Sequence, residues 1–116
     1  MSRIETGRIA EAAVQALLVS RGFAIVGTNV RIGRLELDVI ARRGALLVVC
    51  EVRSRRGSLI DPALTFDVAK QARVRQAALR YWASHARGCA LRIDAAAVTF
   101  GEAGTPTIRY FENVFV

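Results

Sequence analysis

The sequence predicts a single α/β domain in which helices cover a central β-sheet. Two segments carry apolar residues at helical spacing and five are rich in β-branched residues, in the order α-β-β-β-α-β-β. The chain has 116 residues, of which 53% are hydrophobic, so one domain over residues 1–116 can fill one core. We find no internal repeat, linker or low-complexity segment in the sequence.

The first helix is predicted over residues 7–21, where Gly22 provides the stop. The face expected to be buried consists of Ile9, Ala13, Ala16, Leu17 and Ser20. A helical wheel places Glu11 with Leu18, away from that face, which leaves Glu11 either near a site or on the surface. Residues 23–32 follow as a strand, since β-branched residues are frequent there.

Residues 35–42 and 45–53 are predicted to form two strands joined by a tight turn at Arg43-Gly44. Both faces of each strand carry apolar residues, so both faces are expected to be covered. If the turn has two loop residues, Asp38 and Glu51 become diagonal neighbours on the same face, about 7–8 Å apart. Asp38 would then lie opposite Val49, and a three-residue turn would place the two acids on opposite faces.

The second helix is predicted over residues 63–87, opened by Asp61-Pro62 and ended by Gly88. Its basic residues fall in one stripe, namely Lys70, Arg73, Arg80 and Arg87. Its apolar residues share the opposite side, namely Val68, Val74, Ala78, Leu79, Tyr81 and Trp82. Strands over 90–100 and 107–116 complete the domain, separated by a turn over 101–106.

The chain is strongly basic, because 17 basic side chains against 10 acidic ones give a net charge of +7 and a pI near 11. Such a surplus favours anionic partners, among which nucleic acid is the commonest. The basic loop that begins at Arg55 and Arg56 is expected to clamp phosphates, and Lys70 and Arg73 to follow a phosphate backbone. The alternative is a solvated arginine-rich surface.

Several classes of protein are disfavoured. Arg or Glu interrupts every apolar run before the ~18 residues that a spanning helix requires, and the N-terminus lacks a signal-peptide pattern. A cytoplasmic protein is therefore expected. Cys50 and Cys89 are predicted to be buried free thiols, and a chain whose only histidine is His85 has little material for a zinc site.

Asp38 and Glu51 suggest a divalent-cation site. An acidic side chain between two covered faces is costly unless it is paired or binds a cation. Mg²⁺ takes one or two carboxylates together with waters and substrate phosphate, and it stabilises charge that builds on a phosphate. The alternative is a pair of solvated or salt-bridged acids at the sheet rim.

These residues resemble the YraN family, proteins similar to Holliday-junction resolvases. Residues 36–41 and 46–55 match the family pattern G-E-I-D-L-I-A followed by L-V-F-V-E-V-K-x-R, a version of the PD-(D/E)xK nuclease signature. Further matches extend over nearly the whole chain: Gly7 and Glu11, Gly22-Phe23, Asn29-Val30-Arg31, Lys70 and Arg73, Arg92-Ile93-Asp94, and Asn113-Val114-Phe115.

The resemblance implies a restriction-endonuclease-like fold with a mixed sheet flanked by helices. Carried over by position, Asp38 and Glu51 are the metal-binding acids and Arg53 takes the place of the nuclease lysine. Glu11 corresponds to a supporting acid and is a third candidate ligand. The resemblance also implies Mg²⁺ or Mn²⁺ as cofactor, DNA rather than RNA as partner and, by analogy with resolvases, a homodimer.

Two positions depart from the family pattern. Leu35 stands where the family has Gly, and Arg53 stands where it has Lys. Arginine supplies charge and hydrogen bonds but stays protonated, so a base role for this position is lost. On the motif alignment Lys70 cannot replace it. The sequence therefore predicts a nuclease-like, nucleic-acid-binding protein and leaves open two alternatives, a catalytically inactive binding module of the same fold and a small interaction protein.

Overall fold

The computed structural model describes residues 2–56 and 67–114, and for positions 55 and 56 it describes the backbone. The elements are α1 (Arg3–Ser20), β1 (Ala24–Ile32), β2 (Leu35–Arg43), β3 (Leu46–Arg56), α2 (Val68–His85), β4 (Ala90–Phe100) and β5 (Pro106–Phe111). The strands form one sheet in the order β1-β2-β3-β4-β5, in which only β3 and β4 are parallel. This confirms the predicted α/β class and element order.

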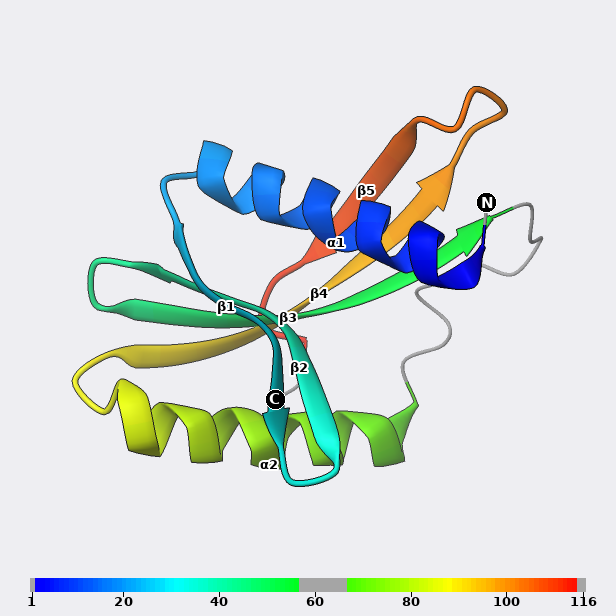
Figure 1. The fold of residues 1–116 in the computed structure, drawn as a ribbon. Coiled ribbons are helices and arrows are strands. Elements are labelled where there is room, and N and C mark those ends of the chain that lie inside the picture. The colour runs from blue at the N-terminus through cyan, green and yellow to red at the C-terminus, as the bar shows by residue number, and fades with distance from the viewer. Residues whose placement is uncertain (1, 57–66, 115–116) are drawn as a thin grey trace.

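The two helices lie on opposite faces of the sheet, α1 on one side and α2 on the other (Figure 1). Each covers its own hydrophobic cluster. Val39, Val48 and Cys50 belong to the cluster beneath α1, whereas Leu47 and Val49 belong to the cluster beneath α2. The expectation that both faces of the hairpin are covered is therefore confirmed, and the architecture is compatible with a restriction-endonuclease-like fold.

The buried face of α1 differs from the predicted one. Ala10, Val14 and Leu18 are buried at a spacing of four residues, whereas Ile9 is exposed. The helix also begins earlier than predicted, because the Ser2 hydroxyl accepts a hydrogen bond from the Glu5 amide and caps it. The wheel that placed Ile9 inward was wrong, because several adjacent faces of this alanine-rich helix are apolar enough to pack.

The β2–β3 register is shifted by two residues from the predicted one. Arg43 pairs with Leu46, so the two-residue turn is Gly44-Ala45, and Ile40 pairs with Val49. Gly44 has a φ of +59°, a conformation that favours glycine. Because the shift is by an even number of residues, Asp38 and Glu51 remain on the same face of the hairpin, as predicted. The prediction that Asp38 lies opposite Val49 was wrong, since Ile40 occupies that place.

The second helix begins at Val68, with Asp67 as its N-cap, and ends at His85. The predicted opening at Asp61-Pro62 lies outside the described residues. Val74 and Ala78 are buried as expected, and Tyr81 and Trp82 pack against the cluster beneath α2. Val68, which is 81% exposed, and Leu79 lie outside the core although they share the apolar side of the wheel. The predicted helix end was wrong, because Arg87 lies beyond the helix.

The last strand is shorter than predicted and ends at Phe111. Asn113 takes a φ of +55°, and its backbone amide donates a hydrogen bond to Asp94 instead of continuing the strand. Cys50 and Cys89 are buried free thiols, as the sequence predicts. Among the described residues, no helix is long and apolar enough to cross a membrane.

Candidate metal and nucleic-acid site

Asp38 on β2 and Glu51 on β3 come together where the pairing of these two strands ends. The last paired residues are Val39 and Cys50, directly adjacent to the two acids. The Asp38 amide donates a hydrogen bond to Oε1 of Glu51 at 3.3 Å, and the Val52 amide donates one to Oδ2 of Asp38 at 2.8 Å. The structure therefore brings the two predicted acids side by side, joined by hydrogen bonds between carboxylates and backbone amides.

A break in the alternation of β2 accompanies this arrangement. Leu37 and Ile40 are three residues apart and would face opposite sides of a regular strand, yet both pack beneath α2. On β1, Asn29 adopts a φ of +50°, which is unusual for a residue within a strand. Its neighbours Thr28 and Val30 pair with the residues on either side of Asp38. The sheet is thus irregular at the level of the carboxylates.

Burial determines the electrostatics of the pair. Glu51 is only 1% exposed, and desolvation, followed by the charge of Asp38, raises its pKa to about 8. Desolvation likewise raises the pKa of the half-buried Asp38. Two buried carboxyl groups at such close range disfavour the doubly charged state. A cation that joins the site would remove this penalty.

Glu11 approaches the same region from α1. Desolvation raises the pKa of Glu11, and the next largest cause is the charge of Asp38; the Asn29 side chain lowers it through a hydrogen bond. Because the buried face of α1 includes Leu18, Glu11 lies beside the packed side of the helix. In the described part of the chain no three acidic, His or Cys side chains gather closely enough to hold a metal. The role of Glu11 as a ligand stays a prediction.

Two basic side chains act on the carboxylates. The Lys70 ammonium, in the first turn of α2, lowers the pKa of both Asp38 and Glu51, whereas Arg53 lowers that of Asp38. Sequence reasoning assigned Lys70 only to a basic stripe and missed its position beside the acids. The sequence does indicate that Lys70 lies in the first turn of α2, three residues after the N-cap Asp67. Which residues that turn faces depends on how α2 packs against the sheet.

The other predicted contacts with nucleic acid are distributed differently. Arg73 is exposed one turn after Lys70 on α2, as the predicted stripe requires. The backbone at Arg55 and Arg56 continues β3 and pairs with β4. The prediction that these two positions belong to a loop was therefore wrong. Their side chains lie outside the described part of the structure, and their role in binding stays a prediction.

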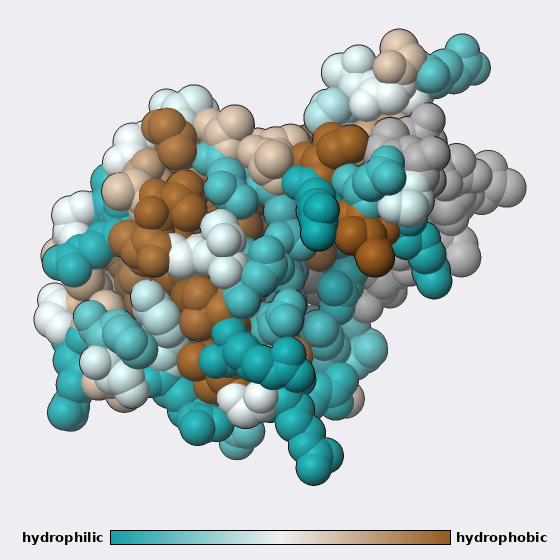
Figure 2. All heavy atoms as spheres, in the orientation of Figure 1, coloured by the Kyte–Doolittle hydropathy of each residue, from teal (hydrophilic) through white to brown (hydrophobic). Residues whose placement is uncertain are grey.

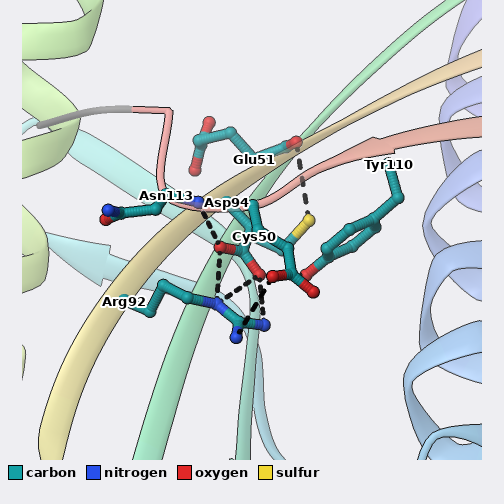
Figure 3. A network of polar contacts seen from close by, with 7 residues as sticks. Cys50, Glu51, Arg92, Asp94, Tyr110 and Asn113 are labelled. Carbon is teal, nitrogen blue, oxygen red and sulfur yellow. Dashed lines mark hydrogen bonds and ion pairs between the residues drawn. The ribbon is translucent and has the colours of Figure 1, made fainter.

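Asp94 is a buried acid whose partners are shown in Figure 3, together with the hydrogen bond from the Cys50 thiol to the Glu51 carbonyl. Arg92 donates to both of its carboxylate oxygens at 3.0–3.2 Å, and the Tyr110 hydroxyl donates at 2.5 Å. The Asn113 amide completes the set at 2.9 Å. Asp94 pairs with Cys50 on β3, one residue from Glu51, and so lies beneath α1 rather than α2. It ties β4, β5 and the C-terminal segment together.

The carboxylate pair suits a hard divalent cation. Mg²⁺ is bound through one or two carboxylates and keeps several waters, so Asp38 and Glu51 are a sufficient protein ligand set. Their oxygen donors are the type that Mg²⁺ and Mn²⁺ prefer. Neighbouring acids whose pKa values are raised by desolvation, as both are here, are also frequent in functional sites.

The fold and this site define an α/β domain of restriction-endonuclease-like architecture that carries a buried carboxylate pair where two strands separate. Residues 10–98 match the uncharacterised protein family UPF0102, and the chain belongs to this family, which is the YraN family. It is 42% identical to a UPF0102 protein of Sorangium cellulosum over 98% of this chain and 83% of that protein. It is also 42% identical to one of Anaeromyxobacter dehalogenans, over 94% and 82% of the two chains, and 34% identical to one of Streptomyces coelicolor, over 93% and 86%.

Proposed function

We propose that this protein binds nucleic acid and hydrolyses phosphodiesters with the help of Mg²⁺ or Mn²⁺ held by Asp38 and Glu51. The observation that carries the proposal is that Asp38 and the buried Glu51 lie side by side in the sheet, with each carboxylate held by a backbone amide of the other's strand. Such a pair is costly in a core unless a cation joins it. A structural pair would be replaceable by apolar residues, whereas a cation site needs both acids.

Each residue has a distinct part in this chemistry. Asp38 and Glu51 supply oxygen ligands, and the hydrogen bonds from Asp38 and Val52 amides fix their orientation. When bound, the cation supplies Lewis-acid stabilisation of charge on a phosphate. Lys70 and Arg53 place positive charge beside the carboxylates, which favours a phosphate there. Neither an arginine nor a charged lysine accepts a proton.

The partner we propose is DNA. A net charge of +7 on 116 residues supports binding to a polyanion, and the resemblance of the motif residues to Holliday-junction resolvases favours DNA over RNA and a homodimer. A cytoplasmic location is part of the proposal. It is supported by two buried cysteines that remain free thiols.

The second candidate is a catalytically inactive DNA-binding module, favoured by Arg53. If a lysine at this position must lose its proton during cleavage, arginine cannot replace it. Lys70 provides the counter-argument, because its positive charge acts on the same two carboxylates from another element. The two candidates differ in cleavage and agree in binding.

A cleavage assay on branched, single-stranded and duplex DNA with Mg²⁺ or Mn²⁺ tests the proposal. The parent should cut at least one substrate, and Asp38→Asn should lower the rate by at least about a hundredfold, since it removes a cation ligand. Arg53→Lys should raise the rate. Glu102→Gln, in the exposed turn between β4 and β5, is the control that loses one carboxylate elsewhere.

The outcomes separate the candidates. Tight binding without cleavage by the parent and by Arg53→Lys would support the binding module. Cleavage by Asp38→Asn at the parental rate would show that the site is wrongly assigned. If no DNA binds at low salt, both candidates fail and an interaction protein remains.

A further inference from the structure

A basic pocket lies between the β1–β2 turn and the exposed side of α2. It has a volume of about 290 Å³. The residues of its wall that matter here are Gly33, Arg34, Leu35, Arg73, Gln76 and Arg80. Figure 1 shows the β1–β2 turn crossing α2 at the lower edge of the molecule, and Figure 2 shows hydrophilic side chains over that edge. Three guanidinium groups and an amide thus line one small space.

The three arginines of the pocket are not neutralised within the described structure. No hydrogen bond or ion pair joins Arg34, Arg73 or Arg80 to another residue in 2–56 or 67–114, and no described acidic side chain lines the pocket. Like charges that converge on one space repel one another, and an anion relieves that repulsion. Guanidinium groups match the oxygens of a phosphate in a bidentate manner.

Gly33 forms the turn at the edge of the pocket, where its positive φ favours glycine. Gly33 has a φ of +61°, and a Cβ atom there would lie 3.5 Å from Nη1 of Arg80. The guanidinium group of Arg80 therefore lies against the turn itself. The β1–β2 turn and α2 together shape the pocket, which neither element forms alone.

The pocket and the carboxylate pair are connected by two elements. Leu35 lines the pocket and Asp38 follows three residues later on β2, a separation of about 10 Å along the strand. Arg73 lines the pocket, and Lys70, whose charge acts on both carboxylates, lies about 4.5 Å earlier along α2. Successive phosphates of one strand are several ångströms apart, so the pocket lies within a few phosphates of the acids along the same strand.

We infer that this pocket binds a backbone phosphate of the same nucleic-acid strand whose reacting phosphate meets Asp38 and Glu51. The inference rests on the proposed function and adds to it a second anchoring point and a direction, along α2. Phosphate contacts of this kind position a strand without reading its sequence. Binding should therefore depend on strand length and little on base composition.

Oligothymidylates of increasing length provide the test. We would measure their affinity by fluorescence anisotropy in EDTA, from two to about twelve nucleotides and at several salt concentrations. The pocket variant is Arg34→Ala/Arg80→Ala. The matched control is Arg75→Ala/Arg87→Ala, which removes the same charge from two exposed arginines outside the pocket. Thermal unfolding of each variant verifies its folding.

The parent should gain affinity once a strand is long enough to span both sites, at about four nucleotides. The pocket variant should lose that gain, bind longer strands roughly tenfold more weakly, and show a salt slope lower by about 0.7 for each lost phosphate contact. The control should keep the length-dependent gain.

Three other results would overturn the inference. Equal losses in both double variants would mean that charge alone matters, while the proposed function stands. A length-independent affinity that only the pocket variant loses would indicate a site for a small phosphorylated ligand. If the parent binds no strand of any length, the proposed function fails and the pocket has no role in it.

Discussion

The backbone amide of Asp38 donates a hydrogen bond to the Glu51 carboxylate across β2 and β3, at 3.3 Å. The Asp38 carboxylate in turn accepts a hydrogen bond from the amide that follows Glu51 in the chain. Each acid is thus oriented by the strand of the other, so neither side chain has to be ordered by a ligand. This preorganisation, combined with burial, gives the pair properties that can be measured without any substrate.

Stability should fall as the pH rises through the neutral range. Burial and the charge of Asp38 raise the pKa of Glu51 from 4.5 to about 8, so the folded chain retains a proton that the unfolded chain releases. The stability from this group is fully present below about pH 4.5 and is lost as the pH rises through about 8. We expect the free energy of unfolding in EDTA to fall by a few kcal/mol across that window.

Urea denaturation at several pH values measures this effect. Glu51→Gln should flatten the dependence and be more stable than the parent near pH 8, because the amide carries no charge at any pH. A parallel decline in parent and Glu51→Gln would contradict the assignment.

A divalent cation should reverse the destabilisation. At a hundredfold excess over its dissociation constant, Mg²⁺ stabilises the folded state by about 2.7 kcal/mol, which raises Tm by roughly 10 °C in a domain of this size. The rise should be larger near pH 8 than near pH 5, because protonated acids bind no cation. Differential scanning fluorimetry measures it, and the exposed Glu102→Gln should behave like the parent. An equal rise in Glu51→Gln would place the cation elsewhere.

Replacement of Lys70 should affect cation and DNA in opposite directions. Lys70→Met removes the ammonium group that lowers the pKa of both carboxyls, so it should raise cation affinity by roughly 1 kcal/mol, about fivefold. The same change should weaken DNA binding, because a phosphate at the site loses a positive neighbour. Calorimetry and anisotropy measure the two effects. Arg75→Met, on the same helix, serves as the control, and a weakening of both affinities would contradict this role for Lys70.

Asp94 should matter for stability and not for cation binding. Asp94→Asn keeps the size of the side chain but removes the charge that holds Arg92, in a position that is 0% exposed. Breaking a buried ion pair from one side costs about 3 kcal/mol. Urea denaturation should show that loss, while Mg²⁺ still raises Tm. If the folded variant no longer responds to Mg²⁺, Asp94 belongs to the cation site after all.

Much of the fold follows from local patterns. The strand over 90–100 matches β4, and the β2–β3 hairpin has a tight turn that includes Gly44, as predicted. The register was off by two residues, because either of two neighbouring turns satisfies the same alternation. The buried side of α1 was also wrong, since its packing against the sheet, rather than its own composition, selects the face.

Part of the candidate site could likewise be predicted from the sequence, and part could not. The proximity of Asp38 and Glu51 could be predicted from the sequence. A shift of the strand register by two residues leaves both side chains on the same face of the hairpin. The effect of the Lys70 charge on both acids could not be predicted, because it depends on how α2 packs against the sheet.

By itself, the sequence determined the order of the elements, the family and the two acids of the site, because each depends on residues that are neighbours along one strand, helix or hairpin. Only the tertiary structure decided which charged side chains of distant segments act on one another. The charge of Lys70 acts on the carboxylates, and Arg80 lies against Gly33, because segments far apart in the chain pack together. Such contacts are fixed by the packing of both helices against opposite faces of the sheet, which no local pattern encodes.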